Sequence, residues 1–426
     1  MASSIYRSRS VWSWALYDFA NSSYTTLVIT FIYATYFTQA MVEDANRGTL
    51  LWSNAITVTA LIVALISPFA GAIADRGGYR KRFLLAATVI CVGGTALLFS
   101  LQPGQIFLAL ALVTVTNVMF EMGHVFYNAY LPELAPPDKM GSVSGLGWGL
   151  GYIGGLICLA VALVFFIQTD TPIFGLPKDG THVRATNILV AAWFGLFSIP
   201  LFLFVKDQSV KQTVPASVAV REAAKQLKQT FGELRNYKQI VRFLVARLVY
   251  NDGLVTIFAF GGIYAAETFG FETSDVIIFG IALNLAAGLG AFVFGFVDDK
   301  IGAKPTIYIS LGLLILATIL AVTTTSLTVF WISGILVGLS AGPNQSASRS
   351  LMGRLVPPDK VNEFFGFFAF SGKLTSFMGP LLVGQFTYLF ASQRIGVATV
   401  LIFFIVGIFL LMRVRETDQY HPHVEA

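Results

Sequence analysis

The sequence predicts an all-α, polytopic membrane protein built from two related halves. Hydrophobic residues make up 55% of the 426 residues and charged residues only 12%, a balance typical of membrane proteins and not of soluble domains. Apolar runs long enough to cross about 30 Å of hydrocarbon occur about twelve times. A short helix–loop–helix sequence occurs once in each half of the chain, which indicates a duplication.

The repeated sequence reads Pro-Pro-Asp-Lys at residues 136–139 and again at 357–360. In both copies a long apolar run ends at the prolines, and another begins shortly after the lysine. Glycines follow at equal offsets, namely Gly145 and Gly151 after the first copy and Gly366 and Gly372 after the second. Chance similarity is the alternative, but the matching flanks and glycines favour an internal repeat.

The predicted spans form two groups of six. In the first half they cover residues 12–38, 51–74, 83–101, 106–131, 143–168 and 186–205. In the second half they cover residues 240–265, 275–297, 305–325, 328–347, 364–390 and 395–412. We therefore expect two pseudo-symmetric six-helix bundles, at residues 1–205 and 239–426. The first span is too long and too polar for a signal peptide, so we expect it to be retained.

The segment between the halves, residues 206–238, is polar and is predicted to be a linker. Its later part places Val220, Leu227 and Phe231 on one helical face, as in a helix that lies on a membrane surface. A solvated charged linker is the alternative. Loops on the side of the amino terminus hold about 20 Lys and Arg, and the opposite loops hold about 4. The positive-inside rule therefore predicts that both termini and the linker are cytoplasmic. We expect the protein to lie in the cell (inner) membrane.

Two loops form a second matched pair. Gly71-Ala-Ile-Ala-Asp-Arg-Gly-Gly-Tyr-Arg-Lys-Arg82 follows the second span, and Gly295-Phe-Val-Asp-Asp-Lys-Ile-Gly-Ala-Lys304 follows the eighth. Both resemble the loop signature of the major facilitator superfamily, which implies its fold of two six-helix bundles. Carboxylates here can accept charge-assisted bonds from Arg or Lys and hold one conformation closed. Simple positive-inside charge is the alternative. The predicted gating residues are Asp75, Arg76, Arg80, Asp299 and Lys300.

A narrower resemblance covers essentially the whole chain. The segments Trp14-Ala-Leu-Tyr-Asp-Phe-Ala-Asn-Ser-Ser-Tyr24, Arg247-Leu-Val-Tyr-Asn-Asp-Gly253 and Gly342-Pro-Asn-Gln-Ser-Ala-Ser-Arg349 resemble the "unknown major facilitator" family, which includes the autophagy-linked vacuolar amino-acid effluxers of fungi. The resemblance implies transport of a small solute, with export as the expected direction and amino acids or similar metabolites as candidate substrates.

Ionisable residues inside the spans are the best evidence for a site, because charges at membrane depth are retained only where they are paired or face water. In the fourth span Asn117, Glu121, His124 and Asn128 follow helical spacing and form one polar stripe. Because of the internal repeat, this span has an equivalent in the second half. We therefore expect equivalent helices of both halves to direct polar groups at a shared centre. The candidate substrate and coupling-ion residues are Asp18, Asn21, Asn117, Glu121, His124, Asn128, Arg247, Asn251, Asp252, Gln345, Arg349 and Lys373. A hydrogen-bonded cluster between helices is the alternative reading.

These features predict a secondary transporter that works by alternating access, driven by protons carried on Asp18 or Glu121. Sodium coupling, facilitative uptake and a transport-inactive scaffold or receptor are the alternatives. No ATP-binding or hydrolytic motif is found, so we expect no enzyme activity and no cofactor. The only cysteines, Cys91 and Cys158, lie in apolar runs, so we expect no metal site. We expect a monomer with no nucleic-acid partner.

Overall fold

The computed structural model describes residues 5–207 and 215–416, and every regular element in those ranges is a helix. Ten helical segments there are long and apolar enough to cross a membrane. They are built on α4 (Ala45–Gly77), α5 (Arg80–Leu97), α6 (Ile106–Asn128), α8 (Met140–Ala162), α9 (Thr181–Phe204), α11 (Lys238–Phe269), α12 (Thr273–Ile301), α13 (Ala303–Thr323), α14 (Leu327–Leu355) and the pair α17 (Gln393–Ala398) and α18 (Val400–Met412).

The first crossing is interrupted along its length. It consists of α2 (Arg9–Ser23), the π-helical η1 (Tyr24–Phe31), α3 (Tyr33–Tyr36) and the π-helical η2 (Phe37–Met41). Hydroxyl side chains near its first change of geometry bond back to the backbone: Ser23 donates to the carbonyl of Ala20 and Thr25 to that of Ser22. Such bonds compete with regular helical pairing.

The eleventh crossing is broken into α15 (Val361–Lys373) and α16 (Met378–Phe390). Pro380 contributes to the break, because it has no N–H to donate to the carbonyl of Ser376 and its ring would clash there in a regular helix. With the two irregular crossings the described residues provide twelve crossings, and the prediction of an all-α fold with about twelve spans is confirmed.

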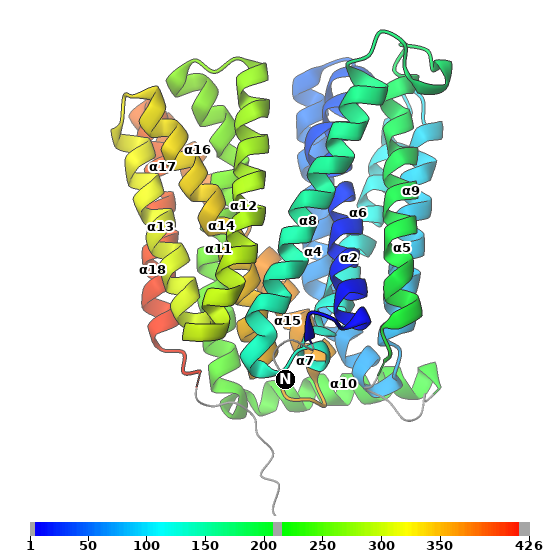
Figure 1. Ribbon diagram of the computed structural model, residues 1–426, viewed down its shortest axis with the longest axis vertical. Coiled ribbons are helices and arrows are strands. Elements are labelled where there is room, and N and C mark those ends of the chain that lie inside the picture. Colours follow the sequence, from blue (N-terminus) through cyan, green and yellow to red (C-terminus); the bar gives the residue numbers. More distant parts are fainter. Residues whose placement is uncertain (1–4, 208–214, 417–426) are drawn as a thin grey trace, which may run out of the picture.

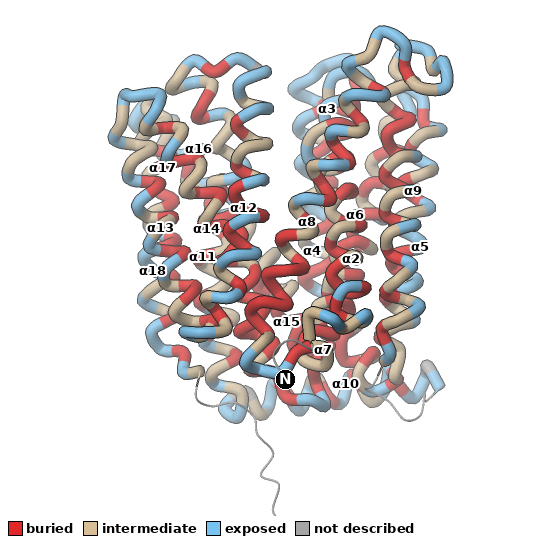
Figure 2. Tube along the Cα trace, viewed as in Figure 1, coloured by how far each residue is buried: buried red, intermediate tan, exposed pale blue. Residues whose placement is uncertain are grey.

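The crossings form two groups, α2–α9 and α11–α18, which stand side by side in Figure 1. The linker helix α10 (Ala216–Gly232) lies across one end of the helices, at the bottom of the view; we call this the linker end. The predicted segments 1–205, 206–238 and 239–426 include residues 1–4, 208–214 and 417–426, which lie outside the described residues. Buried residues concentrate inside each group and around α15 (Figure 2).

The two halves pack closely at the linker end, where α4 contacts α15 and α8 contacts α12. The matched glycines of the repeated hairpin make this approach possible. A Cβ atom on Gly145 would lie 2.4 Å from the carbonyl oxygen of Ala291, and one on Gly366 would lie 2.3 Å from that of Ser67. The repeat therefore places equivalent glycines on both sides of one interface, where a side chain would force the halves apart.

Replacing Gly366 with Ala is expected to open the linker end. Overpacking costs about 1–3 kcal/mol and acts only on the closed arrangement, so the ratio of open to closed protein rises by about 5- to 150-fold. The measurement is the labelling rate of a cysteine placed at Ser346, which is buried between the halves, by a water-soluble maleimide in a chain lacking Cys91 and Cys158. The control is Gly312→Ala, where nothing lies within 4 Å of the added atom. Equal rates for the two variants would contradict the prediction.

Candidate functional site

The carboxylates of the two matched loops each meet the first turn of a helix from the other half. Asp75 accepts hydrogen bonds from the backbone N–H groups of Asn362 (3.0 Å) and Glu363 (2.8 Å) in α15. Asp299 accepts one from the backbone N–H of Ser142 (3.1 Å) in α8. The sequence suggested Arg or Lys partners instead. Helix N termini take that place because their free N–H groups and dipole attract a carboxylate.

Of the basic residues predicted to gate these loops, only Arg80 is held in place. Its guanidinium is buried and lies 2.7 Å from Glu133 in its own half and 2.5 Å from Asp207 at the start of the linker. Arg76 and Lys300 are exposed and form no ion pair with any described residue. Arg80 therefore fixes the loops within the first half, and the contacts that join the halves come from Asp75 and Asp299.

Arg354 is a gating contact that the sequence reading did not include. It lies 2.6 Å from Asp298 and donates through Nε to the carbonyl oxygen of Pro137 in the other half, at 3.0 Å. Arg354 occupies the position in the second hairpin that Glu133 occupies in the first. A comparison of the repeats position by position would have shown this exchange of charge.

A cavity of about 380 Å³ lies between the halves, beyond this closed end. Nine of the twelve candidate residues line it: Asp18, Asn21, Glu121, His124, Asn128, Arg247, Asn251, Gln345 and Lys373. A second cavity of about 310 Å³ shares Thr25, Thr26 and Asn284 with the first. It continues toward the end opposite the linker, because its other lining residues come from later turns of the first and seventh crossings.

One ion pair joins the halves beside the cavity. Nη1 of Arg349, in α14, lies 3.0 Å from Oδ2 of Asp18 in α2, and both side chains are almost completely buried. Arg349 also donates to the Asn128 side chain and, through Nε and Nη2, to the hydroxyl and the carbonyl oxygen of Ser144. Its guanidinium carbon lies 4.8 Å from the ring centre of Trp14. An arginine of the second half is thus held entirely by groups of the first half.

A second ion pair joins the halves inside the cavity. Nζ of Lys373, the last residue of α15, lies 2.6 Å from Oε1 of Glu121 in α6. The pair is partly open to the cavity, with side-chain exposures of 33% for Lys373 and 20% for Glu121. Water and a solute can therefore reach this pair, whereas the pair of Asp18 and Arg349 is sealed.

Arg247 is the third cation at the cavity, and no ion pair joins it to the part of the chain that the structure describes. Its Nη1 donates to the carbonyl oxygen of Phe368 (2.7 Å) and to the hydroxyl of Ser371 (2.9 Å), and the guanidinium lies over the Phe368 ring. No carboxylate of the described residues lies within 4.0 Å of it. Asn251, on the same helix, donates to the carbonyl oxygen of Gly372 at 3.2 Å.

Three candidates do not line the cavity. Arg349 stands behind Asp18, as described above. Asp252 is buried at the break of the eleventh crossing, where Oδ1 accepts from the backbone N–H of Gly379 at 3.3 Å. Asn117 is buried in α6 on the predicted polar stripe but does not reach the cavity. Helical spacing shows which face of a helix a residue lies on, but it does not show how far along that face the cavity extends.

The sequence reading missed several polar and aromatic side chains in the cavity wall, among them Trp148, Tyr152 and Asn284. Tyr152 donates to Oε1 of Gln345 at 2.7 Å, so it joins α8 to α14. Asn284 is the single amide in a long apolar run, and that isolation was a usable signal. The aromatic residues gave none, because aromatic side chains are equally common in packing contacts.

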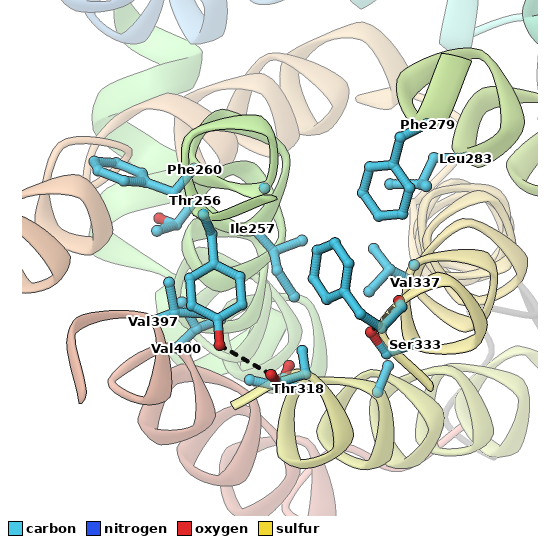
Figure 3. Close-up of a pocket in the computed structure, with 16 residues that line it drawn as sticks. Thr256, Ile257, Phe260, Phe279, Leu283, Thr318, Ser333, Val337, Val397 and Val400 are labelled. Atoms are coloured by element: carbon cyan, nitrogen blue, oxygen red, sulfur yellow. Dashed lines mark hydrogen bonds between the residues drawn. The ribbon is translucent and has the colours of Figure 1, made fainter. Parts of the chain in front are cut away.

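A smaller cavity of about 40 Å³ lies inside the second half alone (Figure 3). Phe279 and Leu283 lie on one side of it and Val397 and Val400 on another. Its lining is almost entirely apolar, so it offers little to orient a solute, and cavities of this kind stay dry. The described residues contain no group of three or more His, Cys, Asp and Glu side chains that could hold a metal ion.

Comparisons with known proteins give a consistent result. The family described as "Vacuole effluxer Atg22 like" matches residues 49–419. The "Uncharacterized MFS-type transporter YxiO" of Bacillus subtilis is 31% identical, over 95% of this chain and 94% of that protein. "Autophagy-related protein 22-1" of Penicillium rubens is 24% identical, over 84% of this chain and 73% of that protein.

Solved structures share the fold at lower identity. The proton:xylose symporter XylE has a TM-score of 0.74 at 14% identity, over 96% of this chain and 95% of that chain. The transporter FucP in its outward conformation has a TM-score of 0.75 at 13% identity, over 95% of this chain and 97% of that one. Both of these proteins are transporters of the major facilitator superfamily, so the arrangement of helices in this chain matches that of known carriers.

Proposed function

Because the chain belongs to the family of Atg22-like vacuole effluxers, and with it to the major facilitator superfamily of transporters, we propose that it moves a small solute through the central cavity by alternating access, driven by protons. The family relationship supports a secondary carrier in the membrane. The coupling ion, the direction and the solute are our proposals. We take amino acids or similar metabolites as the first solutes to test, because the resemblance noted above points to them.

The observation that carries the proposal is that both cavity ion pairs cross between the halves. Asp18 pairs with Arg349, and Glu121 with Lys373. When one half rocks against the other these pairs must break or lengthen, so a proton or a solute that alters their charge changes the relative stability of the two states. A sodium ion bound by Asp18, Asn21 and neighbouring oxygens is the competing driver.

The orientation follows from the charge of the loops. We propose that the linker end faces the cytoplasm, since the Lys and Arg residues concentrate there, and that the described state is closed toward it. We propose export in the sense of the family description, that is, efflux of the solute from the compartment that holds it. A scaffold without transport is the alternative function, and buried charges on several crossings disfavour it because they are costly in a membrane.

The test is flux into vesicles that contain the purified protein. We expect at least one solute from a panel of amino acids, sugars, peptides and organic acids to accumulate under an imposed pH gradient. A triple variant, Glu121→Gln with Arg247→Ala and Lys373→Ala, should lose the flux while still eluting as a folded monomer in detergent. Flux of no solute in wild-type vesicles, or equal flux in the triple variant, would contradict the proposal.

A further inference from the structure

We infer that the transported solute carries a carboxylate or a similar oxyanion, and that Arg247 is the residue that binds it. This inference rests on the proposed transport function, whose solute it narrows by charge. The family resemblance does not specify which residue holds which part of a solute. The charges, the unpaired donors and the walls of the cavity each bear on the question.

The ion pairs around the cavity leave one lining cation unpaired. The two carboxylates that line it, Asp18 and Glu121, are paired with Arg349 and Lys373. Two ion pairs account for both carboxylates, so Arg247 remains without a counter-charge among the described residues. A cation at membrane depth is costly when it is unpaired. An anionic solute that enters the cavity would supply the missing charge.

The geometry of Arg247 leaves its bidentate edge free. Nη1 makes both of its hydrogen bonds, to Phe368 and Ser371, and the ring of Phe368 covers one face of the guanidinium. Nε and Nη2 donate to none of the described residues. This edge presents two parallel N–H groups, which match the two oxygens of a carboxylate. The side chain is thus fixed through one nitrogen while the other two remain available.

Other lining groups also lack acceptors. Nδ2 of Asn21, Nε1 of Trp148 and Nε2 of His124 are buried, and none has a hydrogen-bond partner within the described part of the chain. The first two can only donate. Buried donors of this kind are normally satisfied, so they indicate a solute with oxygen atoms to accept from them. A solute that brought only donor groups would leave them unpaired.

The remaining walls describe the body of the solute. Phe120, Phe365, Leu156 and Val255 line the cavity beside the charged groups. An anion with an apolar or aromatic body of moderate size would bury that surface against them. Carbohydrates lack the charge, and inorganic anions lack the body. We therefore assign the cavity to small organic anions, including zwitterions whose carboxylate is the group that Arg247 holds.

The experiment compares compounds that share a body and differ in charge. The probes are phenylacetate, phenylacetamide and phenethylammonium, and the aliphatic set hexanoate, hexanamide and hexylammonium. Each is titrated into the purified full chain in detergent, and binding is read from the rise in Tm. In wild type we expect each carboxylate to bind at least about tenfold more tightly than its amide, which is the discrimination expected for a charge-assisted pair. The preference should be lost in Arg247→Gln and partly kept in Arg247→Lys.

The matched control is Arg242→Gln on the same helix, where the side chain is exposed and donates to the carbonyl oxygen of Arg413; this variant should bind the probes as wild type does. The proposal fails if wild type shows no preference for carboxylates, if Arg247→Gln retains it, or if chloride alone gives the same stabilisation. Wild-type selectivity decides the substrate class even if Arg247→Gln does not fold. Binding of carboxylates without flux would refute the proposed transport and support the anion site. Flux without a preference for anions would support transport and refute the anion site.

Discussion

Replacing Arg349 with Gln is expected to abolish solute flux and to lower the free energy of unfolding by about 3–5 kcal/mol, the cost of breaking a buried ion pair from one side. The change leaves the carboxylate of Asp18 buried without its cation, 3.0 Å from where Nη1 stood. It also removes the two bonds to Ser144 that join α14 to α8. Flux into vesicles and thermal unfolding in detergent are the measurements.

The double variant Asp18→Asn with Arg349→Gln separates charge from packing. It removes both charges and keeps amides that can hydrogen-bond, so most of the stability should return. Flux should not return, because the charge that responds to movement of the halves is gone. If the single variant Arg349→Gln folds as stably as wild type, the pair is not buried as described. If the double variant transports, the pair is only structural.

The twelve crossings were predictable because length and apolarity decide whether a segment can span a membrane. Even the eleventh span was predicted at residues 364–390, close to the observed limits of α15 and α16. Its break was not predicted, because Gly and Pro are common in membrane helices without breaking them. The sequence reading also ended the tenth span at Ala347, whereas α14 continues to Leu355 through polar residues that the contact with the first half buries.

The candidate residues were predictable, but their partners were not. The sequence placed Glu121 and Lys373 inside spans because charges stand out against apolar runs. Which carboxylate meets which cation depends on how one half is rotated against the other, and no periodicity within a single helix contains that information. The same holds for the gates. The repeat identified two equivalent loops, but only the structure shows that each loop caps the helix after the hairpin of the opposite half.

Replacing Glu121 with Gln is expected to reduce the accumulation of solute driven by a pH gradient by about tenfold or more, while downhill exchange continues. Both predicted proton carriers line the cavity, and Glu121 is the more accessible of the two, because 20% of its side chain is exposed and only 6% of that of Asp18 is. Protonation of Glu121 releases Lys373 and makes the cavity more positive. An anionic solute and a proton should therefore bind together and move in the same direction. The flow of protons out of an acidic compartment would then drive the solute out of that compartment.

Flux into vesicles under a pH gradient, and then under a sodium gradient, is the measurement for wild type and Glu121→Gln. The control is Glu267→Gln, which removes an exposed carboxylate near the end opposite the linker and should accumulate solute as wild type does. Accumulation under a sodium gradient alone would show that sodium, and not the proton, is the coupling ion. Accumulation that follows pH and survives in Glu121→Gln would show that Glu121 is not the carrier, and Asp252, whose Oδ2 is buried without a described partner, would be the next carboxylate to replace.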